Sequence, residues 1–380
     1  MKILLLGPVY PYKGGISHYT SLMARALGER HEVSVLSYSL QYPEILYPGG
    51  NQKDYTNDAF KIEGSHYLLN TVNPISYIKT TAFIERQHPD LLIIQWWHPF
   101  FSPAYWTVTR LVRRTCKILF VCHNVFPHKK FPLQNHLVPL VLRNGDAFIV
   151  QSELDARDLR SIIENPRHAK TVHPTYNAFK VSGLSRSEAR KLLSLEEGEK
   201  VCLFFGFIRE YKGLKTLISA MPEIASSLPG CKLLIVGDFD SRQSRDEYMD
   251  LLENNGCRKN ILLTDRYVPN DEVEKYFAAC DLVVLPYDSA TQSGIAQIAY
   301  GFEKPVVATD VGGLGEVVID GKTGCVVPPK DPHSLASAVI KFFTENRGPE
   351  FAGHIREESY RYSWSKMVDV IEDLYCQMCI

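Results

Sequence analysis

Short apolar runs alternate with helix-like stretches along the chain, and this alternation limits the fold more than any other feature of the sequence. Continuous apolar runs of this length are typical of parallel strands that are buried on both faces. Residues 18–27, between the first two runs, have the pattern of a helix. Strands that alternate with helices predict an α/β fold with a doubly wound parallel sheet. In the front part of the chain the runs are residues 3–6, 33–37, 91–95, 118–122 and 147–151.

The alternation stops at the segment HPTYN, residues 173–177, and then begins again. A chain of 380 residues has room for two domains at about 100–200 residues each. We therefore predict two Rossmann-like domains that face each other across a cleft, residues 1–177 and residues 178–350. We expect the tail, residues 351–380, to form a helix that packs back on the first domain. The second series of apolar runs is residues 201–205, 233–236, 261–263, 282–285 and 305–308.

The overall charge balance excludes a strong general attraction to nucleic acid or to a membrane, because 42 Lys and Arg are matched by 43 Asp and Glu. The balance is uneven, since residues 1–177 sum to about +6 and the remainder to about −7. Such an asymmetry indicates an anionic partner for the first domain, and a solvated surface explains it equally well.

The cysteines and the N-terminal segment predict the cellular compartment of the protein. Nine cysteines lack zinc-type pair spacing, which is typical of buried thiols in a reducing compartment. The first apolar run is too short for a signal peptide, and no run approaches the roughly 18 apolar residues of a spanning helix. We expect a cytoplasmic protein that is at most peripheral at the inner membrane face.

The first candidate site is the loop that ends in Gly14 and Gly15, directly before the first predicted helix. Backbone N–H groups at a helix N-terminus bind anions. A tight turn between strand and helix explains the same glycines.

The second candidate site is the segment FFGFIREYKG, which follows the first strand of the second domain. Arg209 and Lys212 lie three residues apart beside the next helix, an arrangement that suits a pyrophosphate. The alternative is a solvated basic loop. The position at a strand's carboxyl end, where open α/β sheets bind ligands, favours the site.

The third candidate site is the segment SATQSGIAQ, followed by a glycine-rich loop that ends in Glu316. Ser293 and Gly294 directly precede a predicted helix, so their N–H groups could form a second anion cradle. Taken singly, these residues could also be ordinary turns.

Two histidines of the first domain follow predicted strands. His98 and His123 should therefore lie at carboxyl ends of parallel strands, where a histidine can bind a hydroxyl group or transfer a proton. A structural histidine is the usual explanation for His98. His173 fits a structural role at the hinge between the two predicted domains.

A basic cluster follows Trp106 in the helix-like stretch AYWTVTRLVRRTC. Arg110, Arg113 and Arg114 beside an aromatic residue suit an anionic membrane surface, or a solvated helix face. No His, Asp or Glu cluster in the sequence has the spacing of a metal-binding motif, so we predict no metal.

The segments FGFIREYKG, VGDFD, FAACDLVVLPY, PVVATDVGG and DGKTGCVVPP, in this order, resemble the donor half of GT-B glycosyltransferases. More narrowly, they resemble the retaining family four (glycosyl transferases group 1). With GGISHYT and His123, the resemblance covers nearly all of the chain. It implies a nucleoside diphosphate sugar whose diphosphate lies on Arg209 and Lys212, and it places His123 near the donor sugar. Glu316 would contact the nucleotide as in the family, or cap the helix that follows.

One departure from the family concerns two glutamates that it commonly has eight residues apart. Their places are Ala290 and Ile298 here, and neither is acidic. Gln297 could replace the glutamate at the ribose, while Thr291 and Gln292 could approach the sugar or the phosphate. We interpret this segment as a variant donor site.

The resemblance therefore implies a retaining transferase that moves a hexose-type sugar from a UDP- or GDP-sugar to an acceptor hydroxyl. The acceptor would be a saccharide or a lipid-linked molecule, and no nucleic acid is expected. A GT-B-shaped epimerase, or a nucleotide-sugar-binding protein without catalytic activity, remains the alternative. A phosphorylase would need a lysine-bound pyridoxal phosphate, for which the sequence has no motif.

Overall fold

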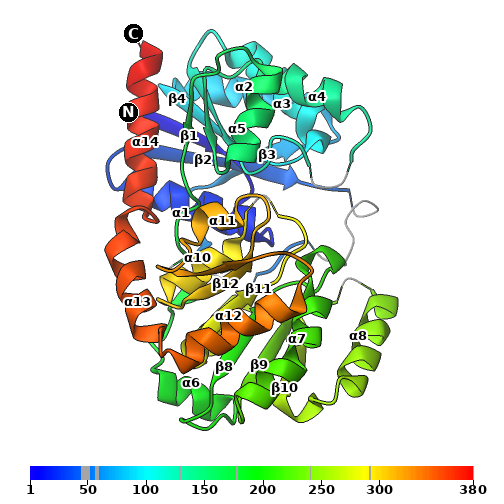
Figure 1. The fold of residues 1–380 in the computed structure, drawn as a ribbon. Helices are drawn as coiled ribbons and strands as arrows, with labels where there is room; N and C mark the ends of the chain where they lie inside the picture. The colour runs from blue at the N-terminus through cyan, green and yellow to red at the C-terminus, as the bar shows by residue number, and fades with distance from the viewer. Residues whose placement is uncertain are drawn as a thin grey trace. The chain divides into compact units, whose positions relative to one another are not determined.

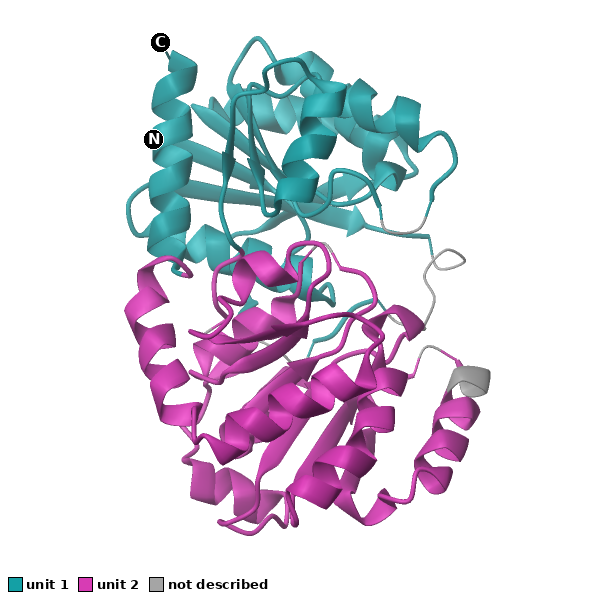
Figure 2. Ribbon diagram, in the orientation of Figure 1, with its two compact units in different colours: residues 1–172, 363–380 teal, residues 173–362 magenta. Residues whose placement is uncertain are grey.

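The chain forms two compact units, each built on one parallel sheet (Figure 2). The structure is a computed structural model that describes residues 1–43, 52–55, 60–127, 130–176, 179–239, 241–290 and 292–379. Unit 1 consists of residues 1–172 and 363–380, and unit 2 of residues 173–362. In both units helices cover the sheet, so the predicted class, two doubly wound α/β domains, is confirmed (Figure 1).

The sheet of unit 1 has seven parallel strands in the order β3-β2-β1-β4-β5-β6-β7. The central strands are buried because both faces are covered, which explains their continuous apolar sequences. The two edge strands, β3 and β7, were not predicted, because they are partly exposed and their sequences HYLLN and HAK lack an apolar run. The strands are β1 Lys2–Leu6, β2 Glu32–Leu40, β3 His66–Asn70, β4 Leu91–Trp96, β5 Lys117–Cys122, β6 Ala147–Val150 and β7 His168–Lys170.

Two separate apolar cores lie on the two faces of this sheet. Helices α1 and α14 share one core, and α2 to α5 share the other. The C-terminal helix therefore packs on the N-terminal unit, as predicted: the Tyr19 and Trp364 rings lie 5.0 Å apart, and Arg30 pairs with Asp369 at 2.7 Å. The helices are α1 Gly15–Gly28, α2 Pro74–Gln87, α3 Ser102–Val112, α4 Gln134–Leu142, α5 Glu153–Ile162 and α14 Trp364–Cys379.

The sheet of unit 2 has six parallel strands in the order β10-β9-β8-β11-β12-β13. The strands are β8 Val201–Phe205, β9 Lys232–Gly237, β10 Ile261–Asp265, β11 Leu282–Leu285, β12 Val306–Thr309 and β13 Gly324–Val327. The helices are α6 Arg186–Leu192, α7 Leu214–Ser227, α8 Arg242–Asn254, α9 Asn270–Ala279, α10 Gly294–Gly301, α11 Leu314–Val317, α12 Pro332–Thr344 and α13 Gly348–Glu357.

Each sheet has one point at which the strand order reverses. In unit 1 this point lies between β1 and β4, and in unit 2 between β8 and β11. Ligands of open α/β sheets bind at the carboxyl ends of the strands at such a point. The loops after β8 and β11 are therefore where a ligand of unit 2 is expected, and they contain the second and third candidate sites.

Candidate active site

The loop after β8 is held close to the loop after β11 by two glycines with positive φ. At Gly213, with φ +63°, a Cβ atom would lie 1.8 Å from the Pro286 carbonyl oxygen, so no side chain fits. At Gly206, with φ +102°, a Cβ atom would lie 3.0 Å from Lys212 Nζ and 3.5 Å from Ile295 Cδ1. The lysine head group and the first turn of α10 are thus both brought to the end of β8.

Lys212 and Arg209 flank this point as cations without counter-ions. Within the part of the chain that the structure describes, neither side chain makes an ion pair or a hydrogen bond. Lys212 is half-buried, with Nζ 5.6 Å from the centre of the Tyr287 ring, and Arg209 is exposed, with Cζ 5.8 Å from that of Phe207. Burial, with a smaller contribution from Arg209, lowers the pKa of Lys212 to about 8.

The N-terminus of α10 lies beside Lys212. Ser293 is buried, its Oγ lies 3.5 Å from the Tyr287 hydroxyl, and it makes no side-chain hydrogen bond that caps the helix. Gly294 begins the helix, and a Cβ atom there would lie 3.5 Å from the Tyr176 ring. The first N–H groups of α10 therefore have no capping side chain of their own, which leaves a positive helix end next to Lys212.

Two polar groups at this edge are buried without a partner among the described residues. They are the Oδ1 atom of Asp288 and both amide atoms of Gln297, whose side chain is fully buried. Burial also raises the pKa of Asp288. A buried amide without hydrogen bonds is costly, so this edge is built with polar groups that the fold itself does not satisfy. The sequence predicted Gln297 as a ligand-binding residue and missed Asp288.

The remaining predicted residues of the third site are placed less tightly. Gln292 is half-buried in the turn before α10, and Thr291 lies outside the described residues. Glu316 is half-buried in α11, after β12, and its carbonyl oxygen accepts a hydrogen bond from Arg361. Ala290 and Ile298 are both buried, 7% and 6% exposed, as apolar side chains require.

In unit 1 the glycine loop does precede a helix. Gly14, with φ +108°, is the N-cap residue of α1, and its carbonyl oxygen accepts hydrogen bonds from the N–H groups of Ser17 and His18. Gly14 and Gly15 are exposed. The loop follows β1, one of the two strands at the reversal point of this sheet.

His123 and His98 lie at neighbouring strand ends but have different surroundings. His123, 8% exposed, has Nε2 2.8 Å from Gln95 Oε1 and meets the Tyr19 ring edge-on. His98 accepts a hydrogen bond at Nδ1 from the Phe100 N–H and so caps a short 3-10 helix, Pro99–Phe101. Burial lowers the pKa of His98. His98 thus has a structural task, whereas the fold orients the His123 ring through Gln95, a residue that the sequence analysis missed.

The arginine cluster lies on α3 and the turn that follows it. Arg110, Arg113 and Arg114 are exposed.

No helix among the described residues has the length and apolar character to cross a bilayer. Among these residues, no three His, Cys, Asp or Glu side chains are grouped as metal ligands.

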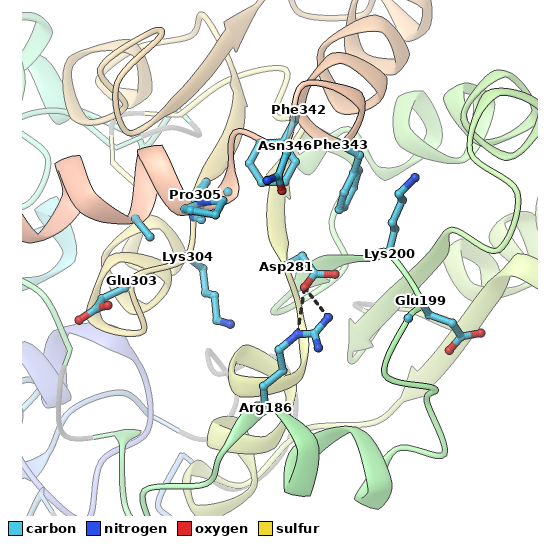
Figure 3. A pocket seen from close by; sticks show the side chains of 14 residues that line it. Arg186, Glu199, Lys200, Asp281, Glu303, Lys304, Pro305, Phe342, Phe343 and Asn346 are labelled. Carbon is cyan, nitrogen blue, oxygen red and sulfur yellow. Dashed lines mark hydrogen bonds and ion pairs between the residues drawn. The ribbon is translucent and has the colours of Figure 1, made fainter.

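A cavity of about 420 Å³ lies elsewhere in unit 2, at the amino ends of the strands. Its lining includes Lys200, Asp281 and Pro305, which directly precede β8, β11 and β12. Figure 3 shows Arg186 directed at Asp281, with which it pairs at 3.1 Å. Behind this pair the fully buried Arg190 contacts the same carboxylate at 2.9 Å and donates to four backbone carbonyls. The cavity therefore lies where the strands begin, which we call the amino edge of the sheet. Arg209 and Lys212 lie beyond the end of β8, at the opposite edge, which we call the carboxyl edge.

Two doubly wound α/β units, each built on one parallel sheet, are the architecture of GT-B glycosyltransferases. Solved structures of similar fold include sucrose-phosphate synthase from Thermosynechococcus elongatus, with a TM-score of 0.76, 18% identity and coverage of 100% of this chain and 99% of that one. Anabaena Alr3699/HepE in complex with UDP has a TM-score of 0.75, with 16% identity and coverage of 99% and 100%.

The sequence matches two family models, described as Glycosyltransferase Family 4 over residues 13–178 and Glycosyl transferases group 1 over residues 199–345. The chain belongs to the group 1 glycosyltransferases. It is 26% identical over 240 residues to D-inositol 3-phosphate glycosyltransferase of Corynebacterium diphtheriae, which covers 61% of this chain and only 56% of that relative. An uncharacterised glycosyltransferase of Methanocaldococcus jannaschii is 22% identical over 391 residues, which cover 99% and 98% of the two chains.

Proposed function

We propose that this protein moves a hexose-type sugar from a UDP- or GDP-sugar to an acceptor hydroxyl, with retention, in polysaccharide or glycolipid biosynthesis. The observation behind this proposal is the pair Arg209 and Lys212, which has no counter-ion in the described chain and lies beside the uncapped start of α10. A diphosphate supplies the negative charge that this site lacks. The Anabaena neighbour is described as bound to UDP and to UDP-glucose, which supports UDP as the first nucleotide to test.

In the proposed reaction the anomeric C–O bond of the donor breaks and the nucleoside diphosphate leaves with its electron pair. The acceptor oxygen forms the new bond on the same face of the sugar, and its proton passes to the departing phosphate. Arg209, Lys212 and the N–H groups after Ser293 would stabilise the charge that develops on the leaving group. This chemistry uses protein cations, so we propose that no metal ion is needed.

His123 is proposed to orient the donor sugar, because Gln95 fixes its ring at a strand end of unit 1. His123→Ala should then lower the transfer rate more than nucleotide affinity, as measured by steady-state kinetics and by calorimetric titration with UDP and GDP. His98→Ala is the matched control, because His98 caps a 3-10 helix and should affect stability more than transfer. Transfer that is unchanged in His123→Ala would leave that residue with a structural role only.

The second candidate is a nucleotide-sugar-binding protein that acts as an epimerase or has no catalytic activity. The observation that favours it is that Ala290 and Ile298 are buried and apolar where related enzymes commonly have glutamates. Only the transferase proposal includes an acceptor, which would be a saccharide or a lipid-linked molecule. Only that proposal includes peripheral contact with an anionic membrane.

One experiment separates the two candidates. The protein is first screened for thermal stabilisation by UDP-, GDP- and ADP-sugars, because a ligand of the folded state raises the melting temperature. The nucleotide sugars that stabilise the protein are then incubated with it, with and without EDTA, and the products are followed by NMR. Slow donor hydrolysis supports a transferase, an isomerised donor supports an epimerase, and binding without chemistry supports the non-catalytic alternative. Loss of turnover in EDTA that Mg²⁺ or Mn²⁺ restores would contradict metal independence.

A further inference from the structure

The outer surface of α2, α3 and α4 concentrates the exposed apolar side chains of the protein. Among the described residues, fourteen large apolar side chains are exposed, and half of them belong to these three helices or the residues that precede them. The helices α2 and α3, and α3 and α4, are in contact, and they lie together on one face of the unit 1 sheet (Figure 1). The seven residues are Val72, Ile75, Ile78, Trp106, Leu111, Leu133 and Leu140. We call them, with the helices that hold them, the α2–α4 face.

The packing of the three helices fixes which side they turn to solvent. Each helix buries one stripe in the same core, through side chains such as Tyr77, Tyr105 and Val138. The opposite stripes therefore point away from the sheet, and in α2 and α3 they contain Ile75, which is 67% exposed, and Trp106, which is 39% exposed. Concentrated exposed apolar surface of this kind marks a site of interaction.

The same face has cations that no acid neutralises. Its exposed basic residues make no ion pair within the described chain: Lys79, Arg86, Arg110, Arg113 and Arg114. The three helices contain one acidic residue, Glu85, and the turn after α4 adds Asp146, whose carboxylate accepts a hydrogen bond from the Ile118 N–H group. Exposed arginines of unit 2 are commonly paired instead, as in Arg266 with Glu272 and Arg356 with Glu303.

We propose that the α2–α4 face docks on an anionic lipid bilayer, with its cations at the phosphates and its apolar side chains inserted between the lipids. This inference rests on the proposed function only in that a lipid-linked acceptor would be presented at such a surface. Apolar and basic side chains on one helix face are the combination that interfacial helices use. A second copy of the chain fits less well, because two such faces would bring like charges together. A free anion would leave the apolar side chains uncovered.

The structure also predicts how binding responds to salt. The cations act through screened electrostatics, so their contribution should fade as the screening length falls from about 10 Å at 0.1 M salt to about 3 Å at 1 M. The inserted apolar side chains are not screened and should leave a salt-resistant remainder. If the face were only basic and inserted no apolar side chains, the protein would dissociate completely from the vesicles at high salt.

The test uses the full chain and two kinds of vesicle, pure phosphatidylcholine and phosphatidylcholine with phosphatidylglycerol. Flotation should show binding to the anionic vesicles, and the emission of Trp106 should shift to the blue. Trp106→Phe should remove most of this shift, because the other tryptophans are buried or half-buried. Arg113→Glu with Arg114→Glu should weaken binding at low salt by at least about 25-fold. Ile75→Ser with Ile78→Ser should lower the fraction that stays bound at high salt, because it removes two of the seven apolar side chains.

The matched control is Lys191→Glu with Lys259→Glu, which changes the net charge equally at exposed positions of unit 2. This control should bind vesicles like the unmodified protein. No binding to anionic vesicles at low salt, or equal weakening by the control, would overturn the proposal. A dimer in sedimentation velocity that Ile75→Ser with Ile78→Ser dissociates would overturn it in favour of a second copy. Thermal stabilisation by UDP or GDP is measured on the same variants, so a failed membrane proposal can be told from a failed donor proposal.

Discussion

The two edges of the unit 2 sheet hold their charged residues in opposite ways. At the amino edge, Arg190 is fully buried, and each nitrogen of its guanidinium group has a partner, among the Asp281 carboxylate and four backbone carbonyls. At the carboxyl edge, Arg209 and Lys212 have no such partner within the described residues. A buried charge is tolerated only when it is paired and hydrogen-bonded, so the amino-edge cluster serves the fold. Under the proposed function, the cations at the carboxyl edge bind the diphosphate of the donor instead.

The substitution Arg190→Ala should have the largest effect and is the most stringent test of the difference between the two edges. This variant leaves the Asp281 carboxylate without the partner at 2.9 Å and removes the donor from four backbone carbonyls, of which that of Ala279 is buried, and it should cost about 3–5 kcal/mol of unfolding free energy. Urea titration followed by circular dichroism measures the loss. Arg186→Ala is the control, because Arg186 pairs with the same carboxylate from a more exposed position and should cost at most about 1 kcal/mol. Equal, small losses in both would mean that the amino-edge cluster is not a stabilising element.

The carboxyl edge should respond in the opposite way. Arg209→Ala or Lys212→Ala removes a charge-assisted contact to a phosphate and should weaken UDP or GDP binding by about ten- to a hundredfold. The unfolding free energy should change little, because within the described chain neither side chain has an ion pair or a hydrogen bond to lose, only a contact with an aromatic ring. Calorimetric titration and urea titration of the same variants give the two values. Normal nucleotide affinity in both variants would remove these residues from the donor site.

The pH dependence of this binding gives a further test. Without a ligand the pKa of Lys212 is lowered to about 8, and a bound diphosphate favours the charged ammonium and raises it. Nucleotide affinity should therefore be highest below pH 8 and should fall as the pH rises above 8, with proton uptake on binding. Lys212→Arg should flatten this profile, since a guanidinium stays charged over the whole range. A wild-type profile that is flat between pH 7 and 9 would contradict the assignment.

The sequence predicted the fold where burial determines the residue types, and it failed where burial is partial. The central strands are covered on both faces and therefore appear as apolar runs, whereas β3 and β7 at the sheet edges mix polar and apolar residues. The helix before which Gly14 stands was predicted because the glycines mark the turn. The C-terminal tail was predicted as one helix, but it forms α13 and α14, separated where the buried Tyr362 donates to the Val317 carbonyl.

The site was predictable to the extent that its chemistry depends on loop position. Arg209 and Lys212 were predicted to lie at the carboxyl edge because they follow a strand, and they do lie there, after β8. That they bind the donor stays a prediction. Gln95 and Asp288 were missed, because their roles depend on contacts between segments that the sequence does not reveal: the 2.8 Å contact to His123, and the close approach of the loops after β8 and β11. A polar residue inside an apolar strand, as Gln95 is in LLIIQW, was the one available signal.

The smallest expected effect concerns Gln297, at which the contrast between the two edges is sharpest. Its amide is fully buried and has no hydrogen-bond partner among the described residues, whereas each guanidinium nitrogen of the equally buried Arg190 has one. If the fold alone determines this residue, Gln297→Leu removes an unsatisfied amide and stabilises the unliganded protein by about 1–3 kcal/mol without any effect on ligands.

If the amide is kept for the donor, the same substitution has two opposite effects. The unliganded protein becomes more stable, and UDP or GDP binding weakens by about two- to tenfold, which is the range for one neutral hydrogen bond. We expect this second outcome, because Gln297 lies in the helix whose first turn meets Lys212 and directly precedes Ile298, the place at which the family resemblance implies a glutamate. Ile298→Val is the control, since it perturbs packing at the adjacent buried position and changes no polar group. A stabilised Gln297→Leu protein with unaltered nucleotide affinity would show that an unsatisfied polar group at this edge is a packing defect, and the contrast would then rest on Arg209 and Lys212 alone.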